Sequence, residues 1–165
     1  MQPSDRTIDD IDLQILHKLQ ENGRESQAEI ARVVRLAPSA VLERIRKLEA
    51  KGVIRGYAAQ VDPAALGQGM LAFIAVRSAE GPSDDSVARQ LGDLPEVLEV
   101  HHVAGDDCYL VKVRTRNSEH LGALLRTQIG SITGVRSTRT TIVLETMKET
   151  SRLHIPPHHT ADEGV

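Results

Sequence analysis

The sequence contains a single cysteine, Cys108, among its 165 residues. One cysteine cannot form an intrachain disulfide, so the chain is not a disulfide-stapled secreted domain, and a reducing cytoplasm fits it. Aromatic residues are almost as rare, because only Tyr57, Phe73 and Tyr109 occur. This scarcity argues against a site for single-stranded nucleic acid, since such sites stack bases on aromatic rings.

The sequence also lacks a long apolar run. No stretch approaches the ~20 apolar residues that span a bilayer. The first twelve residues have neither the basic flank nor the apolar core of a secretory signal. We therefore expect a cytoplasmic chain with no membrane partner. Its length allows one ordinary domain or two small ones, with 40% hydrophobic and 26% charged residues as in globular proteins.

Net positive charge is missing from the chain as a whole but not from every segment. The formal net charge is −3, which would disfavour binding to a phosphate backbone. Residues 24–55, however, contain eight basic and four acidic residues, whereas residues 63–165 contain ten basic and thirteen acidic ones. Only the first of these regions is predicted to face phosphate.

This basic region and the residues before it have the pattern of three helices. Apolar residues recur at helical spacing over residues 8–19, and Thr7 with Asp10 resembles a cap for that helix. Ser26 and Glu29 form a capping box at the start of a second helix. Two short helices joined by a three-residue turn, after a longer first helix, predict a helix-turn-helix domain.

The third helix is predicted to begin at Pro38, where a missing backbone N–H costs nothing. Ala37 is a weak N-cap, so packing must stabilise this helix, and Gly52 is expected to close it in a left-handed conformation. Its apolar stripe consists of Val41, Leu42, Ile45 and Leu48.

With this stripe buried, the third helix would present its polar residues to the major groove of double-stranded DNA. The first turns of such a helix meet base edges, and later residues meet phosphates. Arg44 has the forked guanidinium that pairs with guanine. The alternative is a solvated charged face on an ordinary three-helix bundle, and spacing alone leaves both open. The candidate base contacts are Ser39, Ala40, Glu43 and Arg44, and the candidate phosphate contacts are Arg46, Lys47 and Lys51.

Beyond this domain the pattern changes to alternating strands and helices. Residues 53–61 predict a strand that stops at Asp62-Pro63, and small residues over 63–69 form a linker. Further strands are expected over residues 70–77, 97–104, 108–115 and 135–147. One helix is expected to start at residues 81–83 and another to be capped by Asn117.

The order of these elements predicts an α+β chain: a winged helix-turn-helix domain followed by a ferredoxin-like βαββαβ sandwich. The two helices would cover one face of the sheet and leave the other bare. A monomer rarely exposes a large apolar sheet face, so a face-to-face homodimer is expected. A two-fold dimer would also supply the paired recognition helices that a palindromic operator requires.

Several motifs resemble one family. Residues 8–16 (IDDIDLQIL), 19–24 (LQENGR) and 41–54 (VLERIRKLEAKGVI) are similar to the opening of the Lrp/AsnC feast/famine regulators. Residues 55–63 (RGYAAQVDP) resemble the hinge strand of that family. The resemblance extends from about residue 8 to about residue 153. It implies a RAM-type C-terminal domain and dimers that assemble further into tetramers or octamers.

The resemblance also implies a binding site for a small-molecule effector, an amino acid or related metabolite. The turn over residues 105–109 occupies the place of the family's G-D-x-D-Y turn, which lines a cleft and holds an amine and a carboxylate. Cys108 stands where the family has its second acid, so that carboxylate is lost, shifted or supplied by Asp107. A plain solvent-exposed hairpin turn is the alternative. The carried-over effector residues are Gly105, Asp106, Asp107, Cys108, Tyr109, Thr138, Arg139 and Thr140.

His101, His102 and Cys108 lie close enough in sequence to suggest a metal site, but we predict none. Adjacent residues of a strand point to opposite faces, so the two histidines cannot chelate one ion together. No spacing typical of a structural zinc site and no arrangement for a nucleophilic cysteine is present. No catalytic motif or cofactor site is present either, so we expect no enzyme activity.

We interpret the chain as a helix-turn-helix domain with its hinge strand over residues 1–62, a linker over 63–69, a ligand-binding and oligomerisation domain over 70–153, and a disordered tail over 154–165. The expected function is sequence-specific transcriptional regulation that responds to an amino acid or related metabolite. An architectural DNA-coating protein and, less in keeping with the basic third helix, a metabolite-binding enzyme are the rival interpretations.

Overall fold

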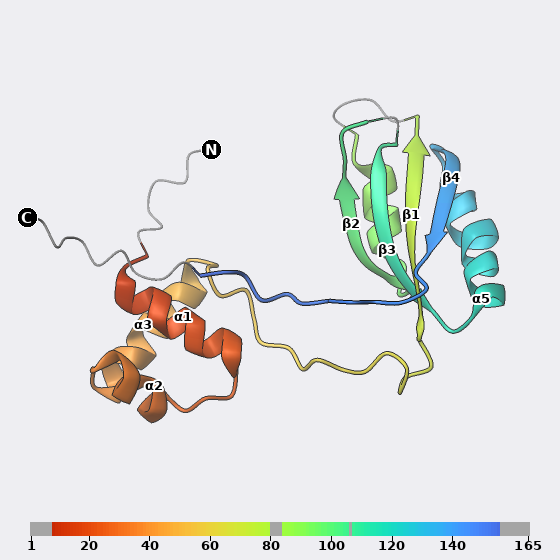
Figure 1. Cartoon of the computed structure of the whole chain (residues 1–165). Coiled ribbons are helices and arrows are strands. Elements are labelled where there is room, and N and C mark those ends of the chain that lie inside the picture. The colour runs from red at the N-terminus through yellow and green to blue at the C-terminus, as the bar shows by residue number, and fades with distance from the viewer. Residues whose placement is uncertain (1–7, 80–83, 106, 156–165) are drawn as a thin grey trace, which may run out of the picture. The chain divides into compact units, whose positions relative to one another are not determined.

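The computed structural model describes residues 8–79, 84–105 and 107–155. The chain divides into two compact units (Figure 1). The first contains the described part of residues 1–59 and 150–165, and the second contains that of residues 60–149. Within the described residues, no helix is both long and apolar enough to cross a membrane.

The first unit is built from three helices: α1 (Asp10–Glu21), α2 (Gln27–Val34) and α3 (Pro38–Ala50). Their apolar stripes meet in one core, in which Ile15, Ile30 and Val41 are fully buried. The segment after residue 149 belongs to this unit because Gln20 of α1 holds it. The Gln20 side chain donates to the Leu153 carbonyl at 3.1 Å and accepts from the Leu153 N–H at 2.7 Å. Residues 150–153, expected in the second domain, therefore pack with the first.

Local capping explains where these helices begin. The Ser26–Glu29 capping box of α2 is confirmed, and Pro38 is the first residue of α3, whose N-cap Ala37 makes no side-chain hydrogen bond. The predicted cap of the first helix is wrong. Asp9 is the N-cap of α1 and forms a capping box with Asp12, because its carboxylate accepts from the N–H three residues on. Thr7 lies outside the described residues.

The turn between α2 and α3 requires an unusual backbone conformation. Arg35, the C-cap of α2, has φ 55° and lies in the left-handed region, which non-glycine residues adopt as single residues at some cost. Gly52 after α3 has φ 66°, as predicted for a left-handed residue at the end of that helix.

The strand predicted over residues 53–61, and with it the expected wing, is wrong for the described chain. No strand is formed between α3 and residue 70 within the described residues. A strand is stabilised by hydrogen bonds to a neighbouring strand, and residues 53–61 have no such neighbour here. Gly56, with φ 151°, also interrupts the segment.

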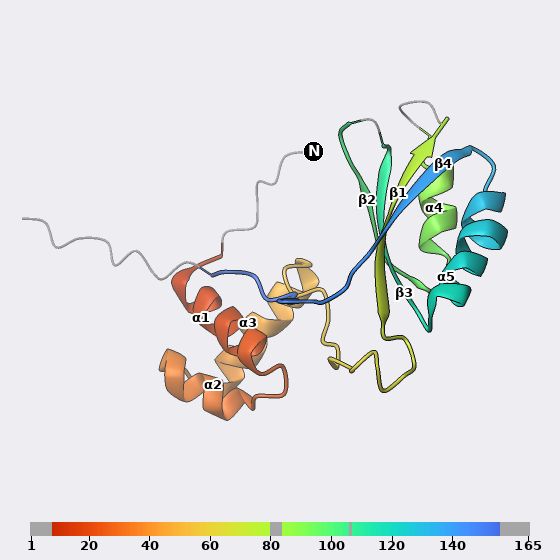
Figure 2. The ribbon, with the colours of Figure 1, turned by 45° about the vertical axis from the view of Figure 1, so that its right-hand side comes forward.

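The second unit is a four-stranded antiparallel sheet with strand order β2-β3-β1-β4. Both of its helices lie on the same side of the sheet (Figure 2). This arrangement confirms the predicted ferredoxin-like sandwich. Its elements are β1 (Met70–Ser78), α4 (Ser86–Gly92), β2 (Val97–His102), β3 (Tyr109–Thr115), α5 (Ser118–Ala123) and β4 (Val135–Ile142). One turn of π-helix (Leu124–Gln128) and a short 3₁₀ turn (Ile129–Ser131) continue α5.

The fourth strand ends earlier than predicted, at Ile142 instead of Met147. Ile142 pairs with Ala72, and the Val143 N–H donates to the Leu71 carbonyl near the start of β1. Because β1 begins at residue 70, which this register places opposite residue 144, residues after 144 have no partner on that strand. Of the other strands, β1 ends one residue after its predicted end, β2 ends two residues early, and β3 begins one residue late. The predicted Asn117 cap of α5 is confirmed. Residues 81–83, the expected start of the other helix, lie outside the described residues, and α4 begins at Ser86.

Candidate functional site

Helix α3 presents a polar outer face, as the helix-turn-helix interpretation requires. Val41 and Ile45 are buried in the core shared with α1 and α2, and Leu48 is buried as well. The side chains of Ser39, Glu43, Arg46, Lys47 and Lys51 are exposed, whereas Ala40 and Arg44 are half-buried. The structure therefore brings the candidate DNA contacts onto one helix but separates Arg44 from the exposed set.

Arg44 contacts two carboxylates at the start of α1. Its Nη1 atom lies 2.7 Å from Asp9 Oδ2 and 2.8 Å from Asp12 Oδ1. Burial alone would raise the pKa of the Asp9 carboxyl. The Asp12 backbone N–H and the Arg44 guanidinium outweigh that effect, so this pKa lies below its ordinary value. The ion pairs thus attach the recognition helix to the capping box of α1. Sequence reasoning missed them because Asp9 and Arg44 are 35 positions apart.

The remaining basic residues of α3 differ in their partners. Lys47 forms an ion pair with Glu43, one helical turn earlier, at 2.9 Å. The hydrogen bond from Lys47 lowers the pKa of the Glu43 carboxyl. Arg46 and Lys51 form no ion pair with any residue that the structure describes. These two cations are therefore available for an external anion.

The turn between β2 and β3 is tied to the end of β1. The Cys108 N–H donates to the Val76 carbonyl at 2.9 Å. The Cys108 sulfur accepts from the Ser78 N–H at 3.4 Å and lies 3.7 Å from the Ser78 carbonyl, next to an irregularity in the β1–β4 register. Gly105 has φ 132°, a conformation that favours glycine. Asp106 lies outside the described residues.

The structure separates the candidate effector residues into two groups. Asp107 and Arg139 form an ion pair, with Arg139 Nη2 at 2.7 Å from Asp107 Oδ2. Tyr109, by contrast, is 4% exposed and belongs to the core under the helices. Thr138 and Thr140 pair with Val76 and Ile74, which face that same core, so they lie on the opposite side of β4 from Arg139. A binding site at this turn, on the open face of the sheet, would therefore be formed around Asp107 and Arg139.

The two adjacent histidines of β2 point to opposite faces of the sheet, as predicted. His101 contacts Glu99 at 3.1 Å on the open face. The His102 ring lies 5.3 Å from the Tyr109 ring on the side of the helices. Among the described residues, no group of three or more His, Cys, Asp or Glu side chains is arranged to hold a metal ion.

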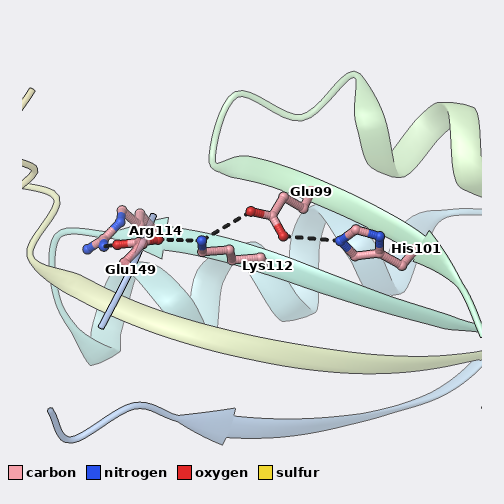
Figure 3. A network of polar contacts seen from close by, with 5 residues as sticks. All are labelled: Glu99, His101, Lys112, Arg114 and Glu149. Atoms are coloured by element: carbon pink, nitrogen blue, oxygen red, sulfur yellow. Dashed lines mark hydrogen bonds and ion pairs between the residues drawn. The ribbon is translucent and has the colours of Figure 1, made fainter. Parts of the chain in front are cut away.

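The open face of the sheet carries a network of ion pairs that sequence reasoning missed (Figure 3). Lys112 of β3 contacts Glu99 at 3.1 Å and also pairs with Glu149, which contacts Arg114 at 2.9 Å. Hydrogen bonds from His101 and Lys112 lower the pKa of Glu99, and the hydrogen bond from Lys112 lowers that of Glu149. The signal in the sequence was the pair of cations at alternate positions of an otherwise apolar strand.

Two family matches together span most of the chain. Residues 8–49 match the AsnC-type helix-turn-helix domain, and residues 71–153 match the Lrp/AsnC ligand binding domain. To within one residue, the first match covers the three helices of the first unit and the second covers the whole sheet of the second unit.

Similar proteins agree with these matches. The chain is 47% identical over 148 residues to the HTH-type transcriptional regulator FL11 of Pyrococcus horikoshii, covering 90% of this chain and 97% of that protein. It is 36% identical over 152 residues to the leucine-responsive regulatory protein of Escherichia coli K12, covering 91% of this chain and 93% of that one.

Solved structures give the same result. A transcriptional regulator of Neisseria meningitidis in complex with L-methionine superposes with a TM-score of 0.83 at 32% identity, covering 90% of this chain and 97% of that one. The feast or famine regulatory protein of M. tuberculosis complexed with L-methionine also has a TM-score of 0.83, at 36% identity, covering 90% and 99%. With three helices in helix-turn-helix order, a ferredoxin-like sheet and these relatives over nine-tenths of its length, the chain belongs to the Lrp/AsnC family of transcriptional regulators.

Proposed function

We propose that this chain is a homo-oligomeric regulator that inserts α3 into the major groove of double-stranded DNA and binds an amino acid through its second unit. The observation that supports DNA binding is that Arg46 and Lys51, two exposed cations on the helix that follows the turn, form no ion pair with any of the described residues. A protein with a net charge of −3 gains from concentrating free cations where phosphates lie.

The roles along α3 follow from exposure and partners. Ser39 and Glu43, in the first turns, would approach base edges, and half-buried Ala40 would let the helix sit close to the bases. Arg46, Lys47 and Lys51 would contact phosphates. Arg44 is a weaker candidate for guanine recognition than its residue type suggests, because its guanidinium would have to leave Asp9 and Asp12.

The partner that we assign to the open sheet face is a second copy of the chain. The centre of this face is apolar: Phe73 and Leu110 are half-buried, and Leu71 and Ala75 are already buried within the chain; all four alternate with residues of the helix-covered core. A two-fold pairing of two such faces would cover the remaining exposed part of Phe73 and Leu110 and place two α3 helices in one assembly. Further association into tetramers or octamers remains part of this proposal.

The effector would bind at the turn between β2 and β3. The support for this is the match to a ligand binding domain and the L-methionine named in the complexes of two structural relatives. The bound amino acid would change DNA affinity through its different affinity for the alternative assemblies. A regulator of this kind is not an enzyme, and it works in the cytoplasm, where a bacterial or archaeal cell keeps its DNA.

The test is fluorescence anisotropy of labelled DNA from upstream of the gene, against a scrambled duplex, with and without a mixture of amino acids. We expect tighter binding to the upstream fragment and a change in affinity when the mixture is added. Equal affinity for both duplexes, unaffected by the mixture, would instead support an architectural DNA-coating protein and contradict the proposal.

A pair of variants tests the assignment of phosphate contacts. Arg46→Ala and Lys51→Ala should each weaken binding to both duplexes and reduce the slope of log affinity against log salt by about 1. Arg136→Ala, an exposed arginine of β4 in the second unit, is the matched control and should leave that slope unchanged. If the Arg46 and Lys51 variants retain the wild-type slope of log affinity against log salt, neither residue contacts the DNA.

A further inference from the structure

The segment after β4 is anchored in both units of the chain. In the second unit, Glu149 forms ion pairs with two cations of β3 on the open face (Figure 3). In the first unit, the side-chain amide of Gln20 donates to the Leu153 carbonyl and accepts from the Leu153 N–H. Only residues 150–152 lie between these two anchors. We call residues 150–152 the C-terminal tether.

A second connection joins the units before β1. The hydroxyl of Tyr57 donates to Glu49 Oε1 on α3 at 3.1 Å. The Tyr57 ring also lies over Gly23, just after α1, 3.5 Å from the point where a side chain at that position would begin. Since β1 begins at Met70, residues 58–69 form the hinge between this anchor and the sheet. Tyr57 thus attaches the hinge to the first unit.

The two connections differ in the distance that they can span. Consecutive Cα atoms lie about 3.8 Å apart, so the four steps across the tether reach at most about 15 Å. The thirteen steps across the hinge would reach about 45 Å if fully extended. Part of that length is folded into a turn, in which the Gln68 N–H donates to the Pro63 carbonyl at 2.8 Å. The hinge can therefore lengthen, whereas the tether cannot while both of its anchors hold.

We propose that the tether limits how far the helix-turn-helix unit can move from the sheet, and that Gln20 thereby determines which spacing of operator half-sites the protein accepts. This inference rests on the proposed function, because it requires a dimer that carries two α3 helices. One helical turn of DNA is about 34 Å long, so an operator with one additional turn would require each unit to move outwards by about 17 Å. That movement exceeds the reach of the tether but not that of the hinge. Gln20 is thus a positioning residue, since it acts through Leu153 and does not itself contact DNA.

Gln20 is the anchor that a single substitution can release. Its two hydrogen bonds join uncharged groups and involve only the backbone of Leu153, a residue that is 75% exposed. Glu149, by contrast, contacts Lys112 and Arg114, whose side chains are only 13% and 12% exposed, and charge-assisted contacts are stronger than those between neutral groups. Gln20→Met removes both hydrogen bonds but keeps an unbranched side chain of similar length.

Variants of the backbone at residue 153 test the same contact independently. Leu153→Pro removes the N–H from which Gln20 accepts and places the proline ring against the Gln20 side chain. Leu153→Ala retains that N–H and is its matched control. Gln14→Met, at an earlier position of α1, is the matched control for Gln20→Met. Circular dichroism should show the wild-type helix and strand content in all four variants.

Pulsed electron spin resonance on the full-length protein without DNA measures the separation of the units directly. Spin labels are attached at Gln27→Cys on α2 and Arg136→Cys on β4, two exposed positions, in a Cys108→Ser background, and the labelled chain is mixed with an excess of unlabelled chain. We expect Gln20→Met and Leu153→Pro to extend the distance distribution by about 10 Å or more, because the hinge can supply that length. Both controls should match the wild-type chain. If the distributions of Gln20→Met and Leu153→Pro coincide with that of the wild-type chain, the tether does not limit the separation and the inference is wrong.

Fluorescence anisotropy with two operators tests the consequence for DNA binding. Footprinting on the upstream fragment first locates the two half-sites, and a second operator then contains one additional helical turn between them. The wild-type chain should bind the longer operator at least about tenfold more weakly than the native one, because avidity is lost when a linker cannot span both sites. Gln20→Met and Leu153→Pro should bind the two operators within about threefold of each other. Gln14→Met and Leu153→Ala should discriminate between them as the wild-type chain does.

The outcomes distinguish the role of the tether from the proposed function. If the wild-type chain binds the native operator specifically and Gln20→Met and Leu153→Pro retain its discrimination, only the inference about the tether is overturned. Equal affinity of the wild-type chain for both operators would also overturn it. A wild-type chain that does not distinguish the upstream fragment from a scrambled duplex would overturn both the proposed function and this inference.

Discussion

The two faces of the four-stranded sheet differ although they alternate along the same strands. On the face that α4 and α5 cover, Ile74, Val76, Val111 and Val113 are fully buried in one apolar core. On the open face, the neighbouring positions hold Phe73 and the cations Lys112 and Arg114, with Glu99 and Glu149 beside them.

The two faces differ because only one of them is covered by helices of the same chain. The covered face is closed by helices connected through short loops, so its residues are selected for packing alone. The open face combines apolar residues with a network of ion pairs, a composition typical of a surface that meets another molecule. The network also keeps charges on β3, whose other face is buried and carries Tyr109, Val111, Val113 and Thr115.

Adjacent residues of β1 allow this comparison to be tested directly, and the largest effect is expected on the covered face. Ile74→Asp places a carboxylate where the wild-type side chain is 0% exposed. A buried charge without a partner costs several kcal/mol, comparable with the whole stability of a small domain. We expect loss of the β signal of the second unit in circular dichroism. A cooperatively folded second unit in this variant would contradict the assignment of this core.

The neighbouring substitution Phe73→Asp should leave the fold intact but break the proposed dimer. Phe73 is half-buried on the open face, opposite Lys112 and Thr141. Loss of the Phe73 ring from the interface, together with desolvation of the new carboxylate beside Lys112, costs about 3 kcal/mol or more, which raises the dimer dissociation constant by about two orders of magnitude. Light scattering after gel filtration should show monomers.

The control for this variant lies on the other side of the sheet. Thr138→Asp changes an exposed residue of β4 on the side of the helices and should leave the oligomeric state unchanged. If Phe73→Asp retains the wild-type mass at micromolar concentration, the dimer is formed by a different surface.

The smallest effect concerns the ion pairs of the open face. Glu149→Gln should lower the free energy of unfolding at pH 7 by about 0.2–1 kcal/mol, the range for solvent-exposed ion pairs. Because the pKa values of Glu99 and Glu149 are lowered from 4.5 by folding, their contribution is complete above about pH 4.5. It is lost as the pH falls through their lower values in the folded state.

Urea unfolding at pH 7 and at acidic pH measures this contribution. The difference in stability between wild type and Glu149→Gln should shrink as the pH falls below 4.5. A constant difference at all pH values would mean that Glu149 acts through packing and not through its charge.

The sequence was sufficient for most structural features that depend on residues close together in the chain; the N-cap of α1, Asp9 instead of the predicted Thr7, is the exception. The periodicity of the helices, the Ser26–Glu29 box, Pro38 at the start of α3 and the order of strands and helices were all predicted correctly. Prediction was wrong where a partner is required. The strand over residues 53–61 and the last residues of the fourth strand have no neighbouring strand to pair with among the described residues.

The candidate sites show the same division. Residue types and spacing placed the candidate DNA contacts on the third helix, and the family resemblance placed candidate effector residues at the turn over residues 105–109. Only the tertiary structure shows that Arg44 is held by Asp9 and Asp12, that Asp107 pairs with Arg139, and that Glu149 reaches Lys112. These contacts join residues 32 to 37 positions apart. No local pattern specifies such a pairing, because it depends on which strands and helices the fold brings side by side.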